Sequence, residues 1–262
     1  MEVKVNGETL KLELTFSGID DILKREYAAM PFDKAAFDRK AIAAVYRLSA
    51  VPESGRNIIK CYGIVTNEAV IEERYGSLDS YVDYLYEEAN ADKAFADARI
   101  DEMRALNTLV LLSDQYRTTS EDPEFMSGKP DESVSCIIHI DAFIIEKDER
   151  HKGYAKAIWA NMPSLFAEYG IAVRYMTTIV YPMNLDNEEF WRPFSPNYDK
   201  MYRTMAGIIE SQGFVPCTYS ELRWPSAVHI RQFNKRLPVS EENKWRYDSD
   251  DLYAQIMGNQ KK

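Results

Sequence analysis

One stretch of this sequence, residues 134–170, constrains the fold more than any other. Its first part, Val134 to Ile145, is rich in β-branched and aromatic residues and contains no Gly or Pro, which is typical of a buried strand. A charged turn from Lys147 to Lys152 follows. From Gly153 onward, apolar residues recur every three or four positions, which predicts an amphipathic helix that ends at Gly170. The stretch therefore predicts a strand, a cationic turn and a helix in direct succession.

The turn before this helix has the chemistry of a phosphate-binding site. A helix N-terminus presents unpaired backbone N–H groups and a partial positive charge. Gly153 allows the backbone to approach a ligand closely, and Ala155 leaves the path open. Arg150 and Lys152 add positive charge that suits a pyrophosphate. The turn is therefore a candidate site for a ligand that carries a pyrophosphate.

The pattern Arg150-x-x-Gly153-x-Ala155 after a hydrophobic strand resembles the Arg/Gln-x-x-Gly-x-Gly/Ala signature of the GCN5-related N-acetyltransferases, the GNAT superfamily. The resemblance covers roughly residues 134 to 216. It implies an α/β (α+β) fold with a mixed, mostly antiparallel sheet, flanking helices and a splayed central pair of strands. It also implies a reaction, in which an acetyl group passes from acetyl-CoA directly to an amine acceptor.

The same resemblance assigns residues to the cosubstrate. The backbone of residues 143–145 would hydrogen-bond to the pantetheine arm, the turn would hold the pyrophosphate, and an asparagine after the second strand would lie near the pantetheine. The residues implied in binding acetyl-CoA are Phe143, Ile144, Ile145, Arg150, His151, Lys152, Gly153, Tyr154, Ala155 and Asn184.

His139 and Asp141 are candidates for the general base, because an amine must be neutral before it attacks a thioester. His139 lies eleven residues before Arg150, the spacing at which the histone-acetylating branch of the family places a glutamate base. Asp141 follows two residues later and so lies on the same face of the strand. In the alternative interpretation, His139 is a hydrogen-bonded core histidine and Asp141 an acid at the strand edge.

The general acid departs from the family pattern. Many members carry a tyrosine four residues before the glycine of a Gly-Phe pair, and this chain has Ile209 there, before Gly213-Phe214. Tyr202 lies two helical turns earlier on roughly the same face and is the candidate acid, or else a packing tyrosine. Coenzyme A thiolate is a fair leaving group, so a missing acid would not abolish the reaction.

Charge and composition narrow the classes of partner. The net charge of −10 argues against a nucleic-acid partner, which needs a basic face, and would favour a cationic amine acceptor. No apolar run approaches the roughly 18 residues needed to cross a bilayer, and the start of the chain does not read as a signal peptide. Three widely spaced cysteines suggest reduced thiols. We therefore expect a cytoplasmic protein without a membrane partner, whose oligomeric state the sequence leaves open.

The rest of the chain divides into further elements. Residues 1–133 are expected to belong to the same domain as the acetyl-CoA-binding core at 134–238, with a possible insertion at 70–113 and a charged tail at 239–262. The expected elements are a hairpin over 2–15 with an Asn6-Gly7 turn, helices over 19–29 and 33–48, a strand over 57–66, helices over 70–113 of which 107–116 is alternatively a strand, a loop over 118–132, a strand over 171–181, a helix over 198–212, and strands over 215–222 and 227–233.

Two other functions remain open at this level. His139-x-Asp141 with a distant His229 matches the two-histidine, one-carboxylate triad of non-haem Fe(II) oxygenases. Alternatively, the chain binds acyl-CoA as a sensor or scaffold without turning it over, which Ile209 at the usual acid position would favour.

Overall fold

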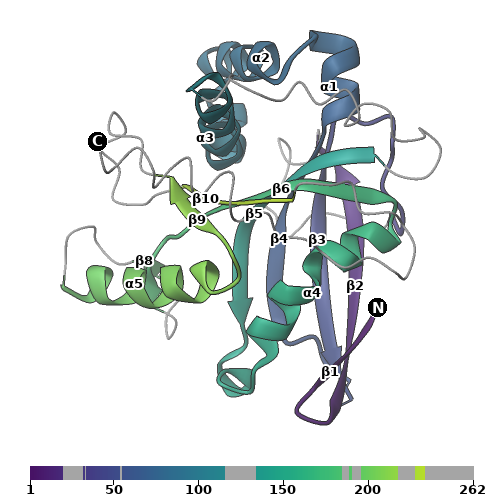
Figure 1. Ribbon diagram of the computed structural model, residues 1–262, viewed down its shortest axis with the longest axis vertical. Coiled ribbons are helices and arrows are strands. Elements are labelled where there is room, and N and C mark those ends of the chain that lie inside the picture. Colours follow the sequence, from purple (N-terminus) through teal and green to yellow (C-terminus); the bar gives the residue numbers. More distant parts are fainter. Residues whose placement is uncertain are drawn as a thin grey trace.

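The computed structural model describes residues 1–19, 32, 34–53, 55–115, 134–184, 189–190, 196–217 and 228–233. Within these ranges, strands and helices from both halves of the chain build one eight-stranded sheet with helices around it (Figure 1). The strands of the sheet are β1 (Glu2–Val5), β2 (Glu8–Gly18), β3 (Ala43–Pro52), β4 (Ile59–Asn67), β5 (Val134–Ile145), β6 (Ile171–Ile179), β9 (Val215–Cys217) and β10 (Val228–Gln232). The short strands β7 (Met183–Asn184) and β8 (Glu189–Phe190) pair separately. The helices are α1 (Glu68–Tyr75), α2 (Leu78–Ala91), α3 (Lys93–Gln115), α4 (Tyr154–Glu168) and α5 (Pro196–Glu210), with a 3-10 turn at Lys147–Glu149.

The strand order is β1-β2-β3-β4-β5-β6-β10-β9. Every neighbouring pair in it is antiparallel except β5 and β6, which run parallel and are joined through α4. A parallel pair needs such a crossover, whereas antiparallel neighbours can be joined by a short turn. The predicted mixed, mostly antiparallel sheet is therefore confirmed.

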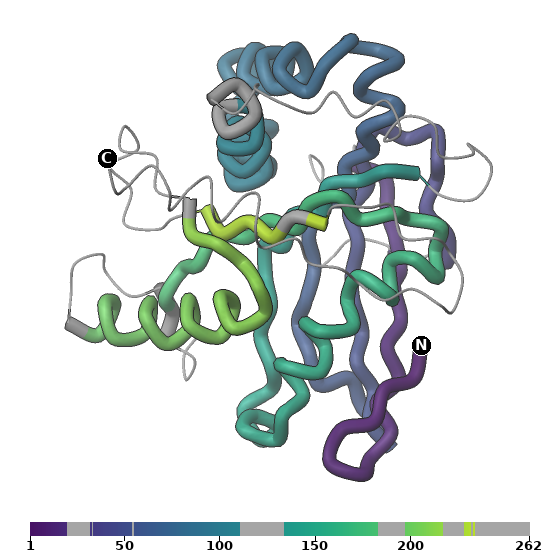
Figure 2. The backbone as a smooth tube through the Cα atoms, in the orientation of Figure 1, coloured from purple at the N-terminus to yellow at the C-terminus, as the bar shows by residue number. Residues whose placement is uncertain are grey.

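Helices cover the sheet on two sides. In β5 the consecutive residues Ile137 and Ile138 belong to different core clusters, so the two clusters lie on opposite faces. Ile138 packs in the cluster that includes Met162 of α4, and Ile137 in the one that includes Leu106 of α3. Figure 2 shows α1, α2 and α3 gathered at the upper end of the sheet and α5 at its lower left. The chain between β4 and β5, residues 68–133, thus supplies three helices where a short turn would suffice.

The predicted N-terminal hairpin is confirmed. Asn6 and Gly7 connect β1 and β2 with φ values of 52° and 90°. Positive φ at both central residues is the conformation of a two-residue turn whose twist matches that of the flanking strands, and Asn-Gly is its favoured sequence.

The predicted helix over 33–48 is wrong, because β3 (Ala43–Pro52) occupies most of its second half. Ala, Leu and Arg favour helices as isolated residues, and they suggested that assignment. In the fold this strand pairs with β2 on one side and β4 on the other, and Ala44, Val45, Tyr46 and Leu48 are buried. A strand covered on both faces shows a continuous apolar run rather than alternation, so periodicity alone could not distinguish it from a helix.

The helices predicted within 70–113 are confirmed, and the alternative strand over 107–116 is wrong, because α3 runs through to Gln115. Ser77 caps α2 as expected, its side chain accepting a hydrogen bond from the N–H of Ser80. The strands over 57–66 and 171–181 and the helices from 153 and 198 are also confirmed, with ends that differ by at most two residues. The expected helix over 19–29, the loop over 118–132, residues 218–222 and the tail at 239–262 lie, except for Ile19, outside the described residues.

The central pair of strands separates at its end. β5 and β6 pair from Val134, opposite Ile171, as far as Ile140, opposite Thr178. β5 then continues to Ile145 along β4, without a partner on its β6 side among the described residues. The splayed central pair is therefore confirmed, and it leaves backbone groups of residues 141–145 facing a gap.

A bulge marks the point of separation. Tyr62 lies opposite Ala142 while Gly63 lies opposite Ile140, so Asp141 is the extra residue of β5. A bulge bends its strand and changes the direction of its side chains. Gly63 makes this bulge possible, because a Cβ atom at that position would lie 2.0 Å from the backbone oxygen of His139.

Candidate active site

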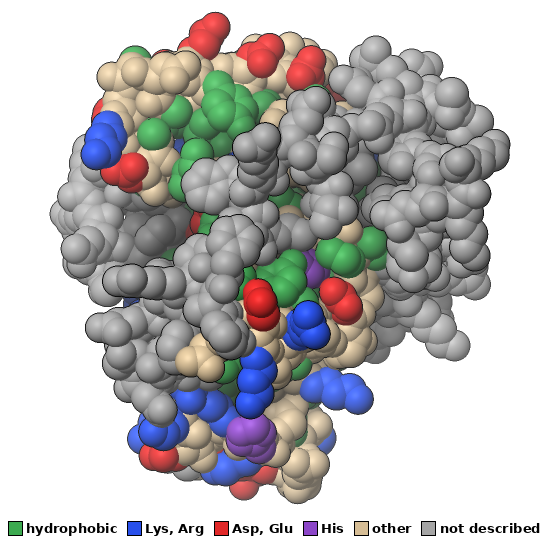
Figure 3. All heavy atoms as spheres, turned by 90° about the vertical axis from the view of Figure 1, so that its left-hand side faces the viewer, with side chains coloured by type: hydrophobic (Ala, Val, Ile, Leu, Met, Phe, Trp, Pro, Cys, Tyr) green, Lys and Arg blue, Asp and Glu red, His purple; other side chains and the backbone are tan. Residues whose placement is uncertain are grey.

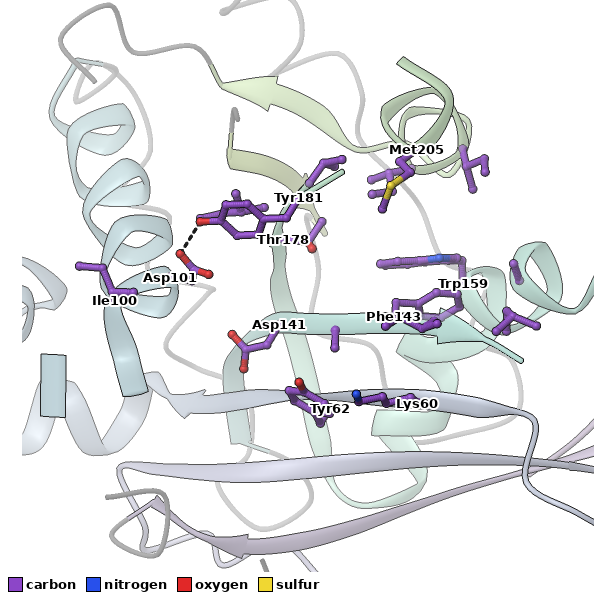
Figure 4. Close-up of a pocket in the computed structure, with 18 of the residues that line it drawn as sticks. Lys60, Tyr62, Ile100, Asp101, Asp141, Phe143, Trp159, Thr178, Tyr181 and Met205 are labelled. Carbon is purple, nitrogen blue, oxygen red and sulfur yellow. Dashed lines mark hydrogen bonds between the residues drawn. The ribbon is translucent and has the colours of Figure 1, made fainter. Parts of the chain in front are cut away.

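A cavity of about 760 Å³ occupies the gap between β5 and β6 and continues on both sides of it. Figure 4 shows its lining, with the side chains of α3 at one end and those of α4 and α5 at the other. Ile100 on α3 and Ile208 on α5 are 44% and 45% exposed, and they border the cavity from opposite ends. They are the exposed large hydrophobic side chains of the described chain, so the apolar surface left uncovered there belongs to this cavity.

The first turn of α4 borders the cavity and differs from those of α1 and α2. Asn67 and Ser77 cap α1 and α2 with side-chain oxygens that accept backbone N–H groups. α4 instead begins at Gly153, with φ 86°, and neither a capping side chain nor an acidic residue occupies its first turn. Its N–H groups therefore lack the side-chain acceptor that α1 and α2 have, which leaves them available to an anion.

The predicted turn residues lie as follows. Arg150 lines the cavity and donates from Nε to the backbone oxygen of Ile145 at 2.9 Å, so its guanidinium is anchored beside the end of β5. Lys152 is exposed and pairs with Glu149 at 2.8 Å. His151 is exposed and has φ 64°, a backbone conformation that is uncommon for residues other than glycine. In Figure 3, Lys and Arg side chains gather in the lower half of the described surface, the end where Figure 1 places this turn.

Tyr154 and Ala155 have different surroundings. Ala155 lines the cavity, as expected of a residue that leaves space for a ligand. Tyr154 is buried, does not line the cavity, and donates a hydrogen bond from its hydroxyl to Glu8 of β2. The Tyr154 side chain thus ties the helix to the N-terminal hairpin.

The cavity is apolar near α4. Phe143, Ile144 and Ile145 of β5 all line it, as their predicted position beside the pantetheine requires. The ring of Phe143 packs on Trp159 of α4 with centroids 4.6 Å apart. On the α5 side the wall is made by Met205, Ile208 and Ile209. Ile209, which replaces the usual tyrosine, therefore does face the cavity.

His139 and Asp141 form a pair at the bulge. His139 is 1% exposed, its Nδ1 lies 2.9 Å from the Thr177 hydroxyl, and its Nε2 lies 3.2 Å from Oδ1 of Asp141. That second contact lacks the alignment of a hydrogen bond and is an ion pair when His139 is protonated. Burial alone would lower the pKa of His139, but the adjacent Asp141 carboxylate, with Asp101 and Glu102 further away, outweighs burial and raises it. Asp141 is 18% exposed and lines the cavity, so it is the member of the pair that a ligand can reach.

A second polar group faces this pair from across the cavity. The Tyr181 hydroxyl donates to Oδ1 of Asp101 at 2.7 Å and accepts from Nη1 of Arg104 at 2.7 Å (Figure 4). Burial, followed by the hydrogen bond to Asp101, raises the pKa of Tyr181 well above its ordinary value. A tyrosine held in this way is a poor proton donor to a thiolate, so this group suits recognition better than acid catalysis.

Tyr202 and Asn184 lie elsewhere. Tyr202 stacks on Tyr198 with ring centroids 6.2 Å apart and lies 6.3 Å from the ring of His229, and it is not among the cavity-lining residues. Asn184 lies in β7, and the side chain of that residue is outside what the structure describes, so its contact with the pantetheine stays a prediction.

The iron-binding triad does not form. His139 contacts Thr177 of β6, whereas His229 of β10 lies opposite Thr178, the next residue of β6. Because consecutive residues of a strand face opposite sides of the sheet, the two histidines lie on opposite faces. His229 instead lies 3.7 Å from Glu210 of α5. Within the described chain there is no group of three His, Cys, Asp or Glu residues placed to hold a metal ion. The oxygenase alternative is therefore wrong.

None of the described helices is both long and apolar enough to span a membrane.

The sequence did not single out several residues of the site. Tyr62, Asp97, Asp101 and Tyr181 all line the cavity, and Gly63 permits the bulge beneath it. Asp97 and Asp101 are four positions apart and share a helix face, a signal visible in the sequence. Nothing in the sequence, however, indicates which strands that face meets.

Comparison with known proteins adds little to this geometry. No family model matches the chain, and no curated protein matches it. Among solved structures, Arabidopsis thaliana NAA60 in complex with a bisubstrate analogue is similar, with 12% identity, 84% of this chain and 99% of that chain covered, and a TM-score of 0.31. NAA60 in complex with acetyl-CoA gives 11% identity, 85% and 99% coverage, and the same TM-score. A likeness at this TM-score does not support a shared function, so the function is inferred from the chain's own residues.

Proposed function

We propose that this protein is an N-acetyltransferase that moves an acetyl group from acetyl-CoA directly to an amine. The observation that carries the proposal is one continuous cavity, which runs from the uncapped first turn of α4, through the gap between β5 and β6, to the carboxylates of α3. Along this path, the first part suits an anion, the second an extended arm with amide groups, and the third an amine. Arg150 and Ala155 of the Arg150-x-x-Gly153-x-Ala155 pattern line the anion end, which supports the role that the GNAT resemblance implies for them.

The unpaired stretch of β5 supports binding of a pantetheine arm. Past Ile140, the strand loses β6 as a neighbour, so its backbone N–H and C=O groups on that side have no ladder to join. Buried backbone groups require partners, and an arm with two amides supplies them in the manner of an added strand. The apolar lining by Phe143, Trp159 and Met205 suits the methylene groups between those amides.

The other end of the cavity supports a cationic acceptor. Asp97, Asp101 and Asp141 contribute three carboxylates to the lining there, from α3 and β5. Lys60 also lines the cavity, but it lies opposite Ile144 of β5 and therefore outside this end. Carboxylates in a partly enclosed site attract an ammonium group more strongly than they would on an open surface.

Asp141 is the residue best placed to act as general base. It faces the cavity at the bulge, next to the unpaired end of β5, while His139 lies behind it at 3.2 Å. As the amine nitrogen bonds to the acetyl carbon and the bond from that carbon to sulfur breaks, the proton lost by the nitrogen passes to Asp141. The Asp141 carboxylate raises the pKa of His139, which contacts Asp141 from the side away from the cavity.

Calorimetric titration with acetyl-CoA, followed by a thiol-release assay with amines of graded charge, tests the proposal. We expect micromolar binding of acetyl-CoA and amine-dependent release of coenzyme A, fastest with amines that carry a second positive charge. Asp101→Asn should raise the KM for such an amine about tenfold, with the Kd for acetyl-CoA unchanged. Absence of acetyl-CoA binding would sink the proposal. Tight binding without thiol release from any amine would favour the acyl-CoA sensor, which Ile209 in the cavity wall also permits.

A further inference from the structure

The N-terminal hairpin contacts the turn that precedes α4, although the two are far apart in sequence. The Nδ2 atom of Asn6 donates a hydrogen bond to the backbone oxygen of Lys152 at 2.8 Å. Tyr154 makes the second tie, through Glu8. In Figures 1 and 2 the hairpin turn and the turn before α4 both lie at the lower end of the sheet.

The contact fixes the orientation of one peptide group. In a trans peptide the C=O and the following N–H point in opposite directions. The carbonyl of Lys152 points toward Asn6, so the N–H of Gly153 points away from the hairpin. Among the described residues, no backbone or capping hydrogen bond uses that N–H, which lies at the uncapped start of α4.

Gly153 by itself would not hold this orientation. Glycine populates positive and negative φ about equally, and a free peptide before it can rotate through a half turn. An added Cβ atom at Gly153 would lie 3.6 Å from Asn6 Nδ2 and 3.7 Å from Val5, so only ordinary van der Waals contact surrounds it there. The amide of Asn6 is the specific polar contact that keeps the Lys152 carbonyl on the hairpin side.

We propose that Asn6 is a positioning residue for the pyrophosphate of acetyl-CoA, holding the Lys152–Gly153 peptide so that its N–H faces the ligand. The inference rests on the proposed function above, and it extends the binding site to the N-terminal strand pair. The same asparagine serves two purposes, because its positive φ makes the hairpin turn while its side chain reaches the ligand-binding turn.

The decisive variant is Asn6→Gly. Gly-Gly retains the two-residue turn, because glycine accepts positive φ at both positions, so the variant removes the amide without adding charge near a pyrophosphate. The matched control is Thr9→Val, which removes the hydrogen bond from Lys4 within the same hairpin and leaves the Lys152 carbonyl untouched. Labelling the protein with ¹⁵N-glycine gives a spectrum of only 11 backbone signals, of which that of Gly153 is assigned by its loss in Gly153→Ala.

We expect Asn6→Gly to weaken acetyl-CoA binding about tenfold, as for loss of one well-aligned hydrogen bond to a charged group, and to remove the shift of the Gly153 signal on adding acetyl-CoA. Thr9→Val should change neither. The inference is overturned if Asn6→Gly keeps both the affinity and the Gly153 shift, or if Thr9→Val causes the same losses. Failure of the proposed function is a separate result, in which the unaltered protein does not bind acetyl-CoA at all.

Discussion

The two ends of the cavity are built in different ways. At the α4 end, most contacts come from one continuous stretch, β5 with the turn and helix that follow it, to which α5 adds an apolar wall, and they depend largely on backbone groups and apolar side chains. At the α3 end, the charged side chains come from separate segments: Asp101 from α3 and Asp141 from β5. A site made from adjacent residues and backbone is specified locally, whereas a site made from distant side chains exists only once the whole sheet has formed.

The largest effect should come from Gly63, which permits the bulge at Asp141. Gly63→Ala would place a Cβ atom 2.0 Å from the backbone oxygen of His139, so the bulge at Asp141 must move. We expect a loss of more than about 3 kcal/mol in the free energy of unfolding, measured by urea titration. Gly207→Ala in α5 is the control, because nothing lies within 4 Å of its added Cβ and alanine favours helices. Equal stability of the two variants would contradict the clash.

Gly153→Asp should disable the α4 end alone. The variant forces a side chain into φ 86° and adds a negative charge where the pyrophosphate is expected. We expect acetyl-CoA affinity, measured by calorimetry, to fall at least about a hundredfold. Gly76→Asp carries the same backbone strain at φ 77° after α1, away from the cavity, and should leave the affinity unchanged. A similar loss of affinity in the control would mean that strain, not the site, is responsible.

Asp141→Asn should disable the α3 end alone. Removal of the base is expected to lower kcat about a hundredfold, while the Kd for acetyl-CoA stays the same. The exposed Asp83 of α2 gives the control variant Asp83→Asn, which should leave kcat unchanged. An unchanged kcat in Asp141→Asn would remove this residue from the mechanism. A weaker affinity for acetyl-CoA with an unchanged kcat would mean that Asp141 belongs to the acetyl-CoA end of the cavity.

The smallest effect concerns the buried histidine. The pKa of His139 is raised in the folded protein, so its ionisation stabilises the fold fully below the unfolded value of about 6.5 and this contribution is lost as pH rises through the folded value. The stability of the protein relative to His139→Gln should therefore be greater at pH 5.5 than at pH 8.5, by about 1 kcal/mol or less. A difference that grows toward high pH would mean that burial, which lowers the pKa, dominates at this site.

This difference between the ends also explains what the sequence could predict. The strand, turn and helix of residues 134–170 and the Asn6-Gly7 hairpin depend on local patterns, and the structure confirms them. The helix expected over 33–48 failed because burial of β3 on both faces overrode helix propensity. Tyr181 and Asp101 meet through tertiary contacts between α3 and the end of β6, which no local pattern encodes.

The bulge shows the same limit at single-residue scale. His139 and Asp141 stood out by residue type and spacing, but Gly63, which makes their arrangement possible, lies in another strand. A glycine in a strand suggests close approach of a second backbone. Only the register between β4 and β5 shows which backbone approaches it.

The helices α1 to α3 lie between two strands that are already neighbours in the sheet, so the order of the strands does not depend on them. They nevertheless supply Asp97, Ile100 and Asp101 to the acceptor end of the cavity. Under the proposed function, their cavity-facing residues are exchangeable, whereas Leu106 and the other residues of these helices that pack on the sheet are not. Replacing the cavity-facing residues alone would change the choice of amine while the acetyl-donor half stayed intact, which makes them the natural place for both evolution and protein engineering to change specificity.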